Sequence, residues 1–152
     1  MKIRIIAVGK IKDQMIRRKI EDYFRKLGKG IEVVSKEVPD GKARALEELK
    51  KQEAGEILAN LPERSFIVAL DERGKELNSW QFAELIKKLS HQSLDLALII
   101  GGAYGLEDKV RSRADLVLAL SQLTFSHELA RLILAEQIFR AFSLIKGTPY
   151  HH

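Results

Sequence analysis

The segment LALIIGGAYG, residues 96–105, combines the two features that most constrain the fold of this chain. Its first half is apolar at every position, which predicts a strand at 96–100 buried on both faces of a sheet. Its second half has three glycines in five residues, which is typical of a tight turn whose backbone can approach a ligand. Ligands in open α/β sheets bind at the carboxyl ends of strands, so this turn is a candidate site. It has neither G-x-G-x-x-G spacing nor a P-loop lysine, and a turn without a ligand explains it equally well.

On both sides of this segment, apolar β-branched runs alternate with stretches of helical periodicity. Further strands are predicted at 2–9, 31–38, 65–70 and 116–120. Helices are predicted at 13–27, from 46 to about 61, from 78 or 79 onward, at 107–114 and at 127–145. Asp13 is the expected N-cap of the first helix, and Asn78 has capping-box spacing to Gln81. Strands that alternate with helices predict an α/β fold with a mainly parallel sheet.

The composition predicts one domain over residues 1–152, because 152 residues with 45% apolar content suffice for a single core. The absence of cysteine excludes disulfides, cysteine-ligated metal centres and thiol nucleophiles. No apolar run exceeds five residues, so we expect no membrane partner and a cytoplasmic location. The apolar start, interrupted by Arg4 and without a cleavage site, is interpreted as a mature N-terminus.

Basic residues are concentrated in the first third of the chain. Residues 1–51 contain 15 Lys and Arg against 8 Asp and Glu, whereas residues 52–152 contain 11 against 13. Clustered cations attract phosphate, so a nucleic acid is a candidate partner. A solvated helix face is the alternative interpretation.

The last predicted helix is apolar on almost every face, with large side chains at 129, 132, 133, 134, 138, 139, 142, 144 and 145. One apolar stripe would pack on the sheet, whereas apolar residues on most faces need a second partner. We therefore expect a homodimer that pairs through this helix.

Polar residues around the start of this helix form the next candidates. The loop before it mixes hydroxyl and apolar side chains without charge, which could wrap an adenine, although the residues alone favour a helix N-cap at Thr124 or Ser126. His127 and Arg131 are four residues apart near the positive end of the helix, where they could grip a phosphate.

Two further groups lie towards the C-terminus. Glu136 and Arg140 are also four residues apart, which is typical of a surface ion pair, but they interrupt an apolar helix and so are candidates for a buried functional pair. The tail ends in Pro149, Tyr150 and His151, which favours a tail that docks over a disordered end or a tag remnant.

Taken together, these segments resemble the ribosomal RNA large subunit methyltransferase H family, of the knotted SPOUT class. The resemblance spans essentially the whole chain, and it departs from the family where Ala103-Tyr104 replaces Pro-Glu and where Ser126 replaces proline. The matching segments are Ile5-Ile6-Ala7-Val8-Gly9-Lys10, Glu37-Val38-Pro39, Val68-Ala69-Leu70-Asp71, Ile100-Gly101-Gly102 with Gly105-Leu106, residues 120–125, His127 with Arg131, Glu136 with Arg140-Ala141, and the ending Tyr150-His151.

The resemblance implies a single SPOUT methyltransferase domain. Its sheet would have five to six mainly parallel strands with helices on both faces, and a C-terminal trefoil knot. It also implies transfer of a methyl group from S-adenosylmethionine to N3 of a pseudouridine in 23S ribosomal RNA within the ribosome, by a homodimer that needs no metal. Cofactor contacts would fall on Leu70, Gly101, Leu120, Ser121, Gln122, Leu123, Thr124 and Phe125.

The same resemblance suggests roles for the remaining candidates. Arg140 would stabilise developing charge, His151 would move a proton and Glu136 would orient Arg140. His127, Arg131 and Tyr150 would bind the RNA substrate. The rival interpretations are a non-catalytic RNA-binding module and a SPOUT enzyme that acts on tRNA, although the chain has no room for a tRNA-binding appendage.

Overall fold

The computed structural model describes residues 1–152 and contains one five-stranded sheet in the order β2-β1-β4-β3-β5. Every strand pair is parallel, which confirms the predicted fold class. The trefoil knot concerns how the chain threads past itself rather than strand order, and it stays a prediction. The elements are β1 (Lys2–Val8), α1 (Gln14–Arg25), β2 (Glu32–Val38), α2 (Leu46–Ala59), β3 (Ser65–Glu76), α3 (Ser79–His91), β4 (Asp95–Ile100), α4 (Asp108–Arg113), β5 (Leu116–Ala119) and α5 (His127–Lys146).

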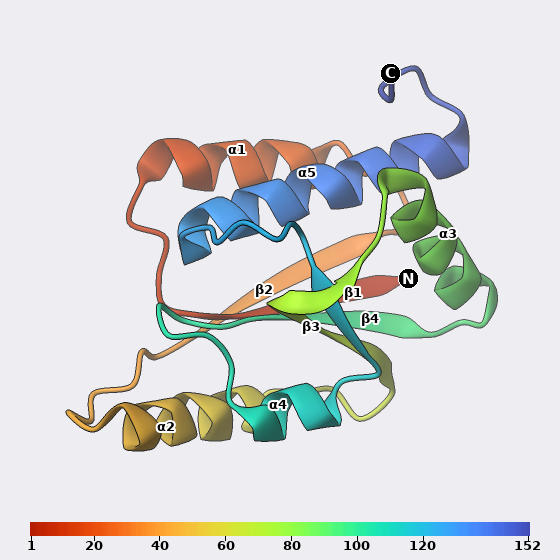
Figure 1. Ribbon diagram of the computed structural model, residues 1–152. Coiled ribbons are helices and arrows are strands. Elements are labelled where there is room, and N and C mark those ends of the chain that lie inside the picture. Colours follow the sequence, from red (N-terminus) through yellow and green to blue (C-terminus); the bar gives the residue numbers. More distant parts are fainter.

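Helices cover both faces of the sheet (Figure 1). Helices α1, α3 and α5 lie over one face, and α2 and α4 lie over the other. Side chains of β1 alternate between the two faces of the sheet. Ile3 and Ile5 belong to one hydrophobic core, and Ile6 and Val8 belong to the other. Residues 96–100 of β4 are all buried, as the unbroken apolar run predicts for a central strand.

Strand β3 is longer than the sequence suggested. It continues beyond Leu70 to Glu76 and pairs with β5 a second time, after a register shift between Leu70 and Lys75. The prediction ended at residue 70 because the following Asp-Glu-Arg-Gly stretch is polar and lacks a period of two. The backbone of β5 passes so close to Gly74 that a Cβ built there would lie 2.7 Å from the carbonyl carbon of Val117.

The helix ends follow the predicted capping residues. The Asp13 carboxylate accepts hydrogen bonds from the backbone N–H groups of Met15 and Ile16, and Asn78 forms a full capping box with Gln81. Helix α1 ends at Arg25, two residues before the predicted end. Ser126 caps α5 by accepting a hydrogen bond from the Leu129 N–H, a bond that a proline side chain at this position could not accept.

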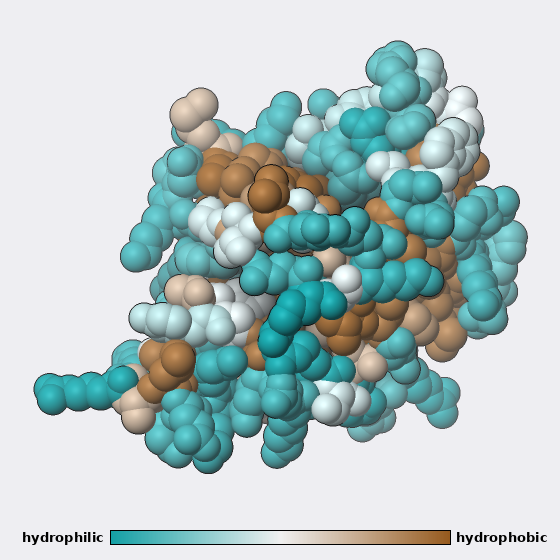
Figure 2. All heavy atoms as spheres, viewed as in Figure 1, coloured by the Kyte–Doolittle hydropathy of each residue, from teal (hydrophilic) through white to brown (hydrophobic).

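Helix α5 finds its second partner largely within the chain, because it packs between α1 and α3 as well as on the sheet. Its all-round apolar character is therefore mostly explained without a second protomer. Leu129 and Ile145 still leave 40% and 37% of their surface exposed, and Met15 at the start of α1 is 80% exposed. Figure 2 shows apolar atoms gathered on this face of the molecule over α1 and α5.

None of the helices has the length and apolar content needed to span a membrane.

We expect Gly74→Ala to destabilise the fold by about 1–3 kcal/mol, because an added methyl group must displace the backbone of β5. Urea unfolding measures this change. The matched control is Gly55→Ala in α2, where a Cβ meets nothing within 4 Å. That variant should gain roughly 0.5–1 kcal/mol from helix propensity. Equal stability of the two variants would contradict the close approach of β3 and β5.

Candidate functional site

A pocket of about 810 Å³ lies at the carboxyl edge of the sheet. The stretch of β3 at its register shift and the segments that follow β4 and β5 converge there, and the start of α5 and Lys50 of α2 complete it. The lining residues are Lys50, Leu70, Asp71, Glu72, Arg73, Ile100, Gly101, Gly102, Ala103, Tyr104, Gly105, Leu120, Ser121, Leu123, Thr124, Phe125, Ser126, His127 and Ala130.

The pocket contains most of the residues expected to hold a cofactor. Leu70, Gly101 and five of the six residues of the 120–125 loop line it. Gln122 is the exception, because it is exposed outside the lining. The three segments named by the sequence thus meet in one place, although Leu70 lies at the register shift within β3 and not at its end.

The glycine turn after β4 closes on itself. The Gly105 N–H donates a hydrogen bond to the Gly102 carbonyl oxygen at 3.1 Å. A Cβ at Gly101 would lie 3.0 Å from the carbonyl carbon of Gly105 and 3.0 Å from the Leu106 side chain. A side chain at Gly101 would therefore require Gly105 or Leu106 to shift, before any ligand is considered.

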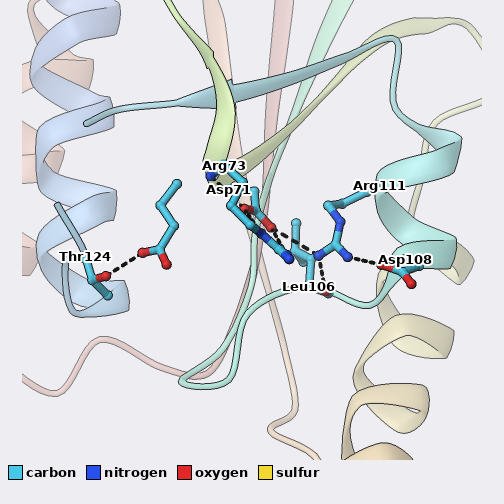
Figure 3. A network of polar contacts seen from close by, with 7 residues as sticks. Asp71, Arg73, Leu106, Asp108, Arg111 and Thr124 are labelled. Carbon is cyan, nitrogen blue, oxygen red and sulfur yellow. Dashed lines mark hydrogen bonds and ion pairs between the residues drawn. The ribbon is translucent and has the colours of Figure 1, made fainter. Parts of the chain in front are cut away.

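A polar network spans β3 and α4 (Figure 3), and two of its members, Asp71 and Arg73, line the pocket. The Asp71 carboxylate accepts hydrogen bonds from the backbone N–H and the Nε of Arg73, at 2.9 and 3.0 Å, and from Nη1 of Arg111 at 3.1 Å. Arg111 also donates to the Leu106 carbonyl oxygen at 2.6 Å and pairs with Asp108. Sequence reasoning missed this network, because 40 residues separate Asp71 from Arg111.

The network changes the ionisation of its central carboxyl group. The hydrogen bond from the Arg73 side chain, with the charges of Arg73 and Arg111, lowers the pKa of Asp71 to about 2. Burial opposes this effect, since only 7% of the Asp71 side chain is exposed. Asp71 is therefore an anion at neutral pH and holds Arg73 at the pocket.

A second contact ties β3 to the loop that follows β5. The Thr124 hydroxyl donates a hydrogen bond to the Glu72 carboxylate, across the side of the pocket opposite Arg111 (Figure 3). Within the loop, the Leu123 N–H donates to the Ser121 hydroxyl oxygen at 3.0 Å. These bonds fix the loop in a shape that leaves its apolar side chains along the pocket.

His127 and Arg131 do not act as a pair. His127 lines the pocket, but Arg131 is 6% exposed and points into the protein. Its guanidinium donates to the Gly9 carbonyl oxygen at 3.2 Å and to the Glu37 carboxylate at 2.9 Å. Burial, the largest single effect, would raise the pKa of Glu37, but the hydrogen bonds from Arg131 and the Ile11 N–H and the charges of Arg131 and Arg17 together lower it. The expectation that Arg131 grips a phosphate does not hold, because its guanidinium is engaged in a structural ion pair.

The remaining predicted residues form a tail cluster, which we define as Glu136, Arg140, Tyr150 and His151. The Glu136 carboxylate accepts from Nη2 of Arg140 at 2.6 Å and from the Tyr150 hydroxyl at 3.2 Å. Arg140 Nη1 lies 3.2 Å from Nδ1 of His151, and its guanidinium stands over the Tyr150 ring at 4.8 Å. Burial, together with hydrogen bonds to Tyr23 and Glu136, raises the pKa of Tyr150.

The tail cluster lies well away from the pocket of its own chain. None of its four residues lines that pocket. Nine residues of α5 separate His127 from Glu136, which at the rise of an α-helix corresponds to about 14 Å. The tail does dock, but on the outer side of its own helix. In addition, no three His, Cys, Asp or Glu side chains are grouped to hold a metal ion.

Known proteins match the chain along its full length. A family described as "Predicted SPOUT methyltransferase" matches residues 1–151. A protein from Trichlorobacter lovleyi is 42% identical over 100% of both chains, and one from Geobacter sulfurreducens is 40% identical over 100% of both. A third, from Halothermothrix orenii, is 40% identical over 99% of both. All three are named ribosomal RNA large subunit methyltransferase H.

Solved structures agree on the fold. A probable methylase family protein from Haemophilus influenzae superposes with a TM-score of 0.57 and 12% identity, over 99% of this chain and 70% of that one. A putative methylase family protein from Neisseria gonorrhoeae gives 0.55 and 14%, over 99% of this chain and 85% of the other. At such identities the likeness concerns the fold alone.

We expect Asp71→Asn to lower the free energy of unfolding by about 2 kcal/mol at pH 7, because it removes the anion that Arg73 and Arg111 stabilise. The folded-state pKa of about 2 lies below the ordinary value of 3.8. The stabilisation is therefore complete above about pH 4 and is lost as the pH falls towards 2. Urea unfolding between pH 2 and pH 7 tests this, with the exposed Glu63→Gln as control. A difference that does not depend on pH would contradict the assignment.

Proposed function

The chain belongs to the SPOUT methyltransferase family, and we propose that it methylates the ribosomal RNA of the large subunit with S-adenosylmethionine as donor. The observation that carries this proposal is the identity of 40–42% with relatives of that name over the full length of both chains. The pocket at the carboxyl edge of the sheet supports it, because the ends of β4 and β5 meet there beside residues 70–73 of β3, in the position where open α/β sheets bind ligands. The proposed target atom is N3 of a pseudouridine in 23S ribosomal RNA.

The pocket has the chemistry that S-adenosylmethionine needs. Leu70, Leu120 and Phe125 offer apolar surface for an adenine ring. Glu72 and Arg73 bring both signs of charge to the wall, which suits the amino and carboxylate groups of the methionine part. When bound, the cofactor supplies a methyl group already activated on a sulfonium. The residues of the chain therefore have mainly to hold and orient the reactants.

The tail cluster is proposed to act on the receiving base. Methylation of N3 releases the proton that this nitrogen carries, and His151 would accept it. Arg140 would stabilise the negative charge that develops on the base, while Glu136 holds the guanidinium through two hydrogen bonds of 3.0 and 2.6 Å. Tyr150 would bind the base, and its ring is fixed by Phe139 at a centroid distance of 4.7 Å.

A homodimer would bring the two halves of the site together. The tail cluster of one protomer lies too far along α5 to serve its own pocket, so we propose that it serves the pocket of the partner. The exposed apolar side chains of Met15, Leu129 and Ile145 on α1 and α5 support pairing through these helices. The proposed active site is thus composite, with pocket and tail cluster from different chains.

Further cations lie at the same edge of the sheet as the pocket, and we propose that they attract the RNA. Lys10, Lys12, Lys42 and Arg44 are exposed in the loops after the carboxyl ends of β1 and β2, and Lys50 lines the pocket itself. Such a group attracts phosphate without reading sequence, and its effect weakens with salt. The proposal includes a cytoplasmic location, because ribosomes are found there.

We expect Phe125→Ala to weaken S-adenosylmethionine binding about tenfold, because it removes an apolar wall of the pocket. Isothermal calorimetry measures the affinity. Gln122→Ala is the matched control, because this residue belongs to the same loop and does not line the pocket. Equal affinities of the two variants would show that the cofactor binds elsewhere.

We expect deletion of residues 150–152 to abolish most methyl transfer while S-adenosylmethionine affinity is retained. A mixed dimer tests whether the tail acts across the interface. A tail-deleted protomer paired with a Phe125→Glu protomer keeps one intact pocket opposite one intact tail cluster, so about half of the activity per dimer should return.

The control pairs the tail-deleted protomer with an Arg140→Ala protomer. Both changes damage the tail cluster, so no activity should return. Tritium transfer from labelled donor to ribosomes gives the rate. If neither mixed dimer is active, the composite site is refuted.

A further inference from the structure

We propose that Trp80 is a stacking platform for an unpaired base of the RNA substrate, beside the tail cluster. Trp80 is the second residue of α3 and the only tryptophan of the chain. Its ring centroid lies 5.4 Å from that of His151, with an interplanar angle of 77°. The inference rests on the proposed function, because it gives that substrate a contact that neither the pocket nor the tail cluster includes.

The exposure of Trp80 needs an explanation. The side chain leaves 57% of its surface exposed, although α3 offers a buried face formed by Phe82, Ala83 and Ile86. Burying an aromatic side chain is worth several kcal/mol, so a large ring left outside the core is a feature with a cost. His151 covers only part of the ring, and the rest is open to a ligand.

The platform is held rigidly. The capping box of Asn78 and Gln81 fixes the first turn of α3 on either side of Trp80. The Ser79 hydroxyl donates to Oε1 of Gln137 at 2.8 Å, and Gln137 donates in turn to Glu136 at 2.6 Å. The start of α3 is thereby fastened to the same stretch of α5 that carries the tail cluster. A preorganised aromatic ring binds without losing much conformational entropy.

The surroundings favour a nucleobase over an apolar protein partner. The centres of protein interfaces are depleted of charged residues, whereas Trp80 stands beside His151, whose Nδ1 lies 3.2 Å from the guanidinium of Arg140. Unpaired RNA bases stack on aromatic rings, and neighbouring cations attract the phosphates that join them. His151 is the group proposed to take a proton from the reacting base. A base that stacks on Trp80 would therefore be the target nucleotide or one next to it.

The single tryptophan makes the contact directly measurable. Indole fluorescence is quenched when a base stacks on the ring, so titration of the full-length protein with a single-stranded oligoribonucleotide should quench it. An oligonucleotide of the same length with abasic sites keeps the phosphates and removes the rings. We expect quenching by the first and little by the second. Equal quenching by both would overturn the proposal, because it would reflect phosphate binding alone.

The kinetics of ribosome methylation by Trp80 variants provide a second, independent test. Trp80→Ala should raise the KM for ribosomes about tenfold, the usual effect of one lost stacking contact, with kcat and S-adenosylmethionine affinity nearly unchanged. Trp80→Phe should restore most of the loss. The control is Leu46→Ala, which removes an apolar side chain that is 51% exposed on α2, and its KM should not change.

An unchanged KM for ribosomes in Trp80→Ala would overturn the proposal that Trp80 stacks on a base. Absence of ribosome methylation by the unmodified protein would instead refute the proposed function, and base-dependent quenching would still establish the platform.

Discussion

The burial of β4 on both faces is the constraint on which the rest of the structure depends. A strand without polar side chains at 96–100 must lie between two other strands and between two layers of helices. The chain meets this requirement by placing β1 and β3 on either side of β4, in parallel, with helices above and below. Parallel strands run towards the same edge, so the loops after β4 and β5 and the stretch of β3 at its register shift meet in one pocket. The binding site is a consequence of how the centre of the sheet is buried.

The sequence predicts those features of the fold that depend on residues close together in the chain, and it does not predict those that depend on distant residues. Strand β4 and the caps at Asp13 and Asn78 were predictable, because each depends on residues close together in the chain. The second half of β3 was not, because its pairing with β5 arises from a partner more than forty residues away and leaves no period in the sequence.

The same distinction between local and distant interactions explains which features of the candidate site were predictable. Helical spacing placed His127 and Arg131 near one another, yet it could not show that Glu37, 94 residues away, takes up the guanidinium. The glycine turn was identified correctly as a constrained loop, although part of its constraint comes from its own closure on Gly105. The network of Asp71 and Arg111 has no local signature at all. Asp71 in β3 and Arg111 in α4 are brought together by the topology of the fold, which no local pattern encodes.

The arrangement of α5 has a consequence for how the protein tolerates change. His127 at its first turn lines the pocket, and Glu136 and Arg140 further along carry the tail cluster. The helix therefore sets the spacing and the angle between the two. Substitutions on its surface leave both intact, whereas removal of one residue between these points would rotate one end by about 100° against the other. Natural variation should accordingly change the length of this helix hardly ever, and its side chains mainly outside the buried positions and the tail cluster.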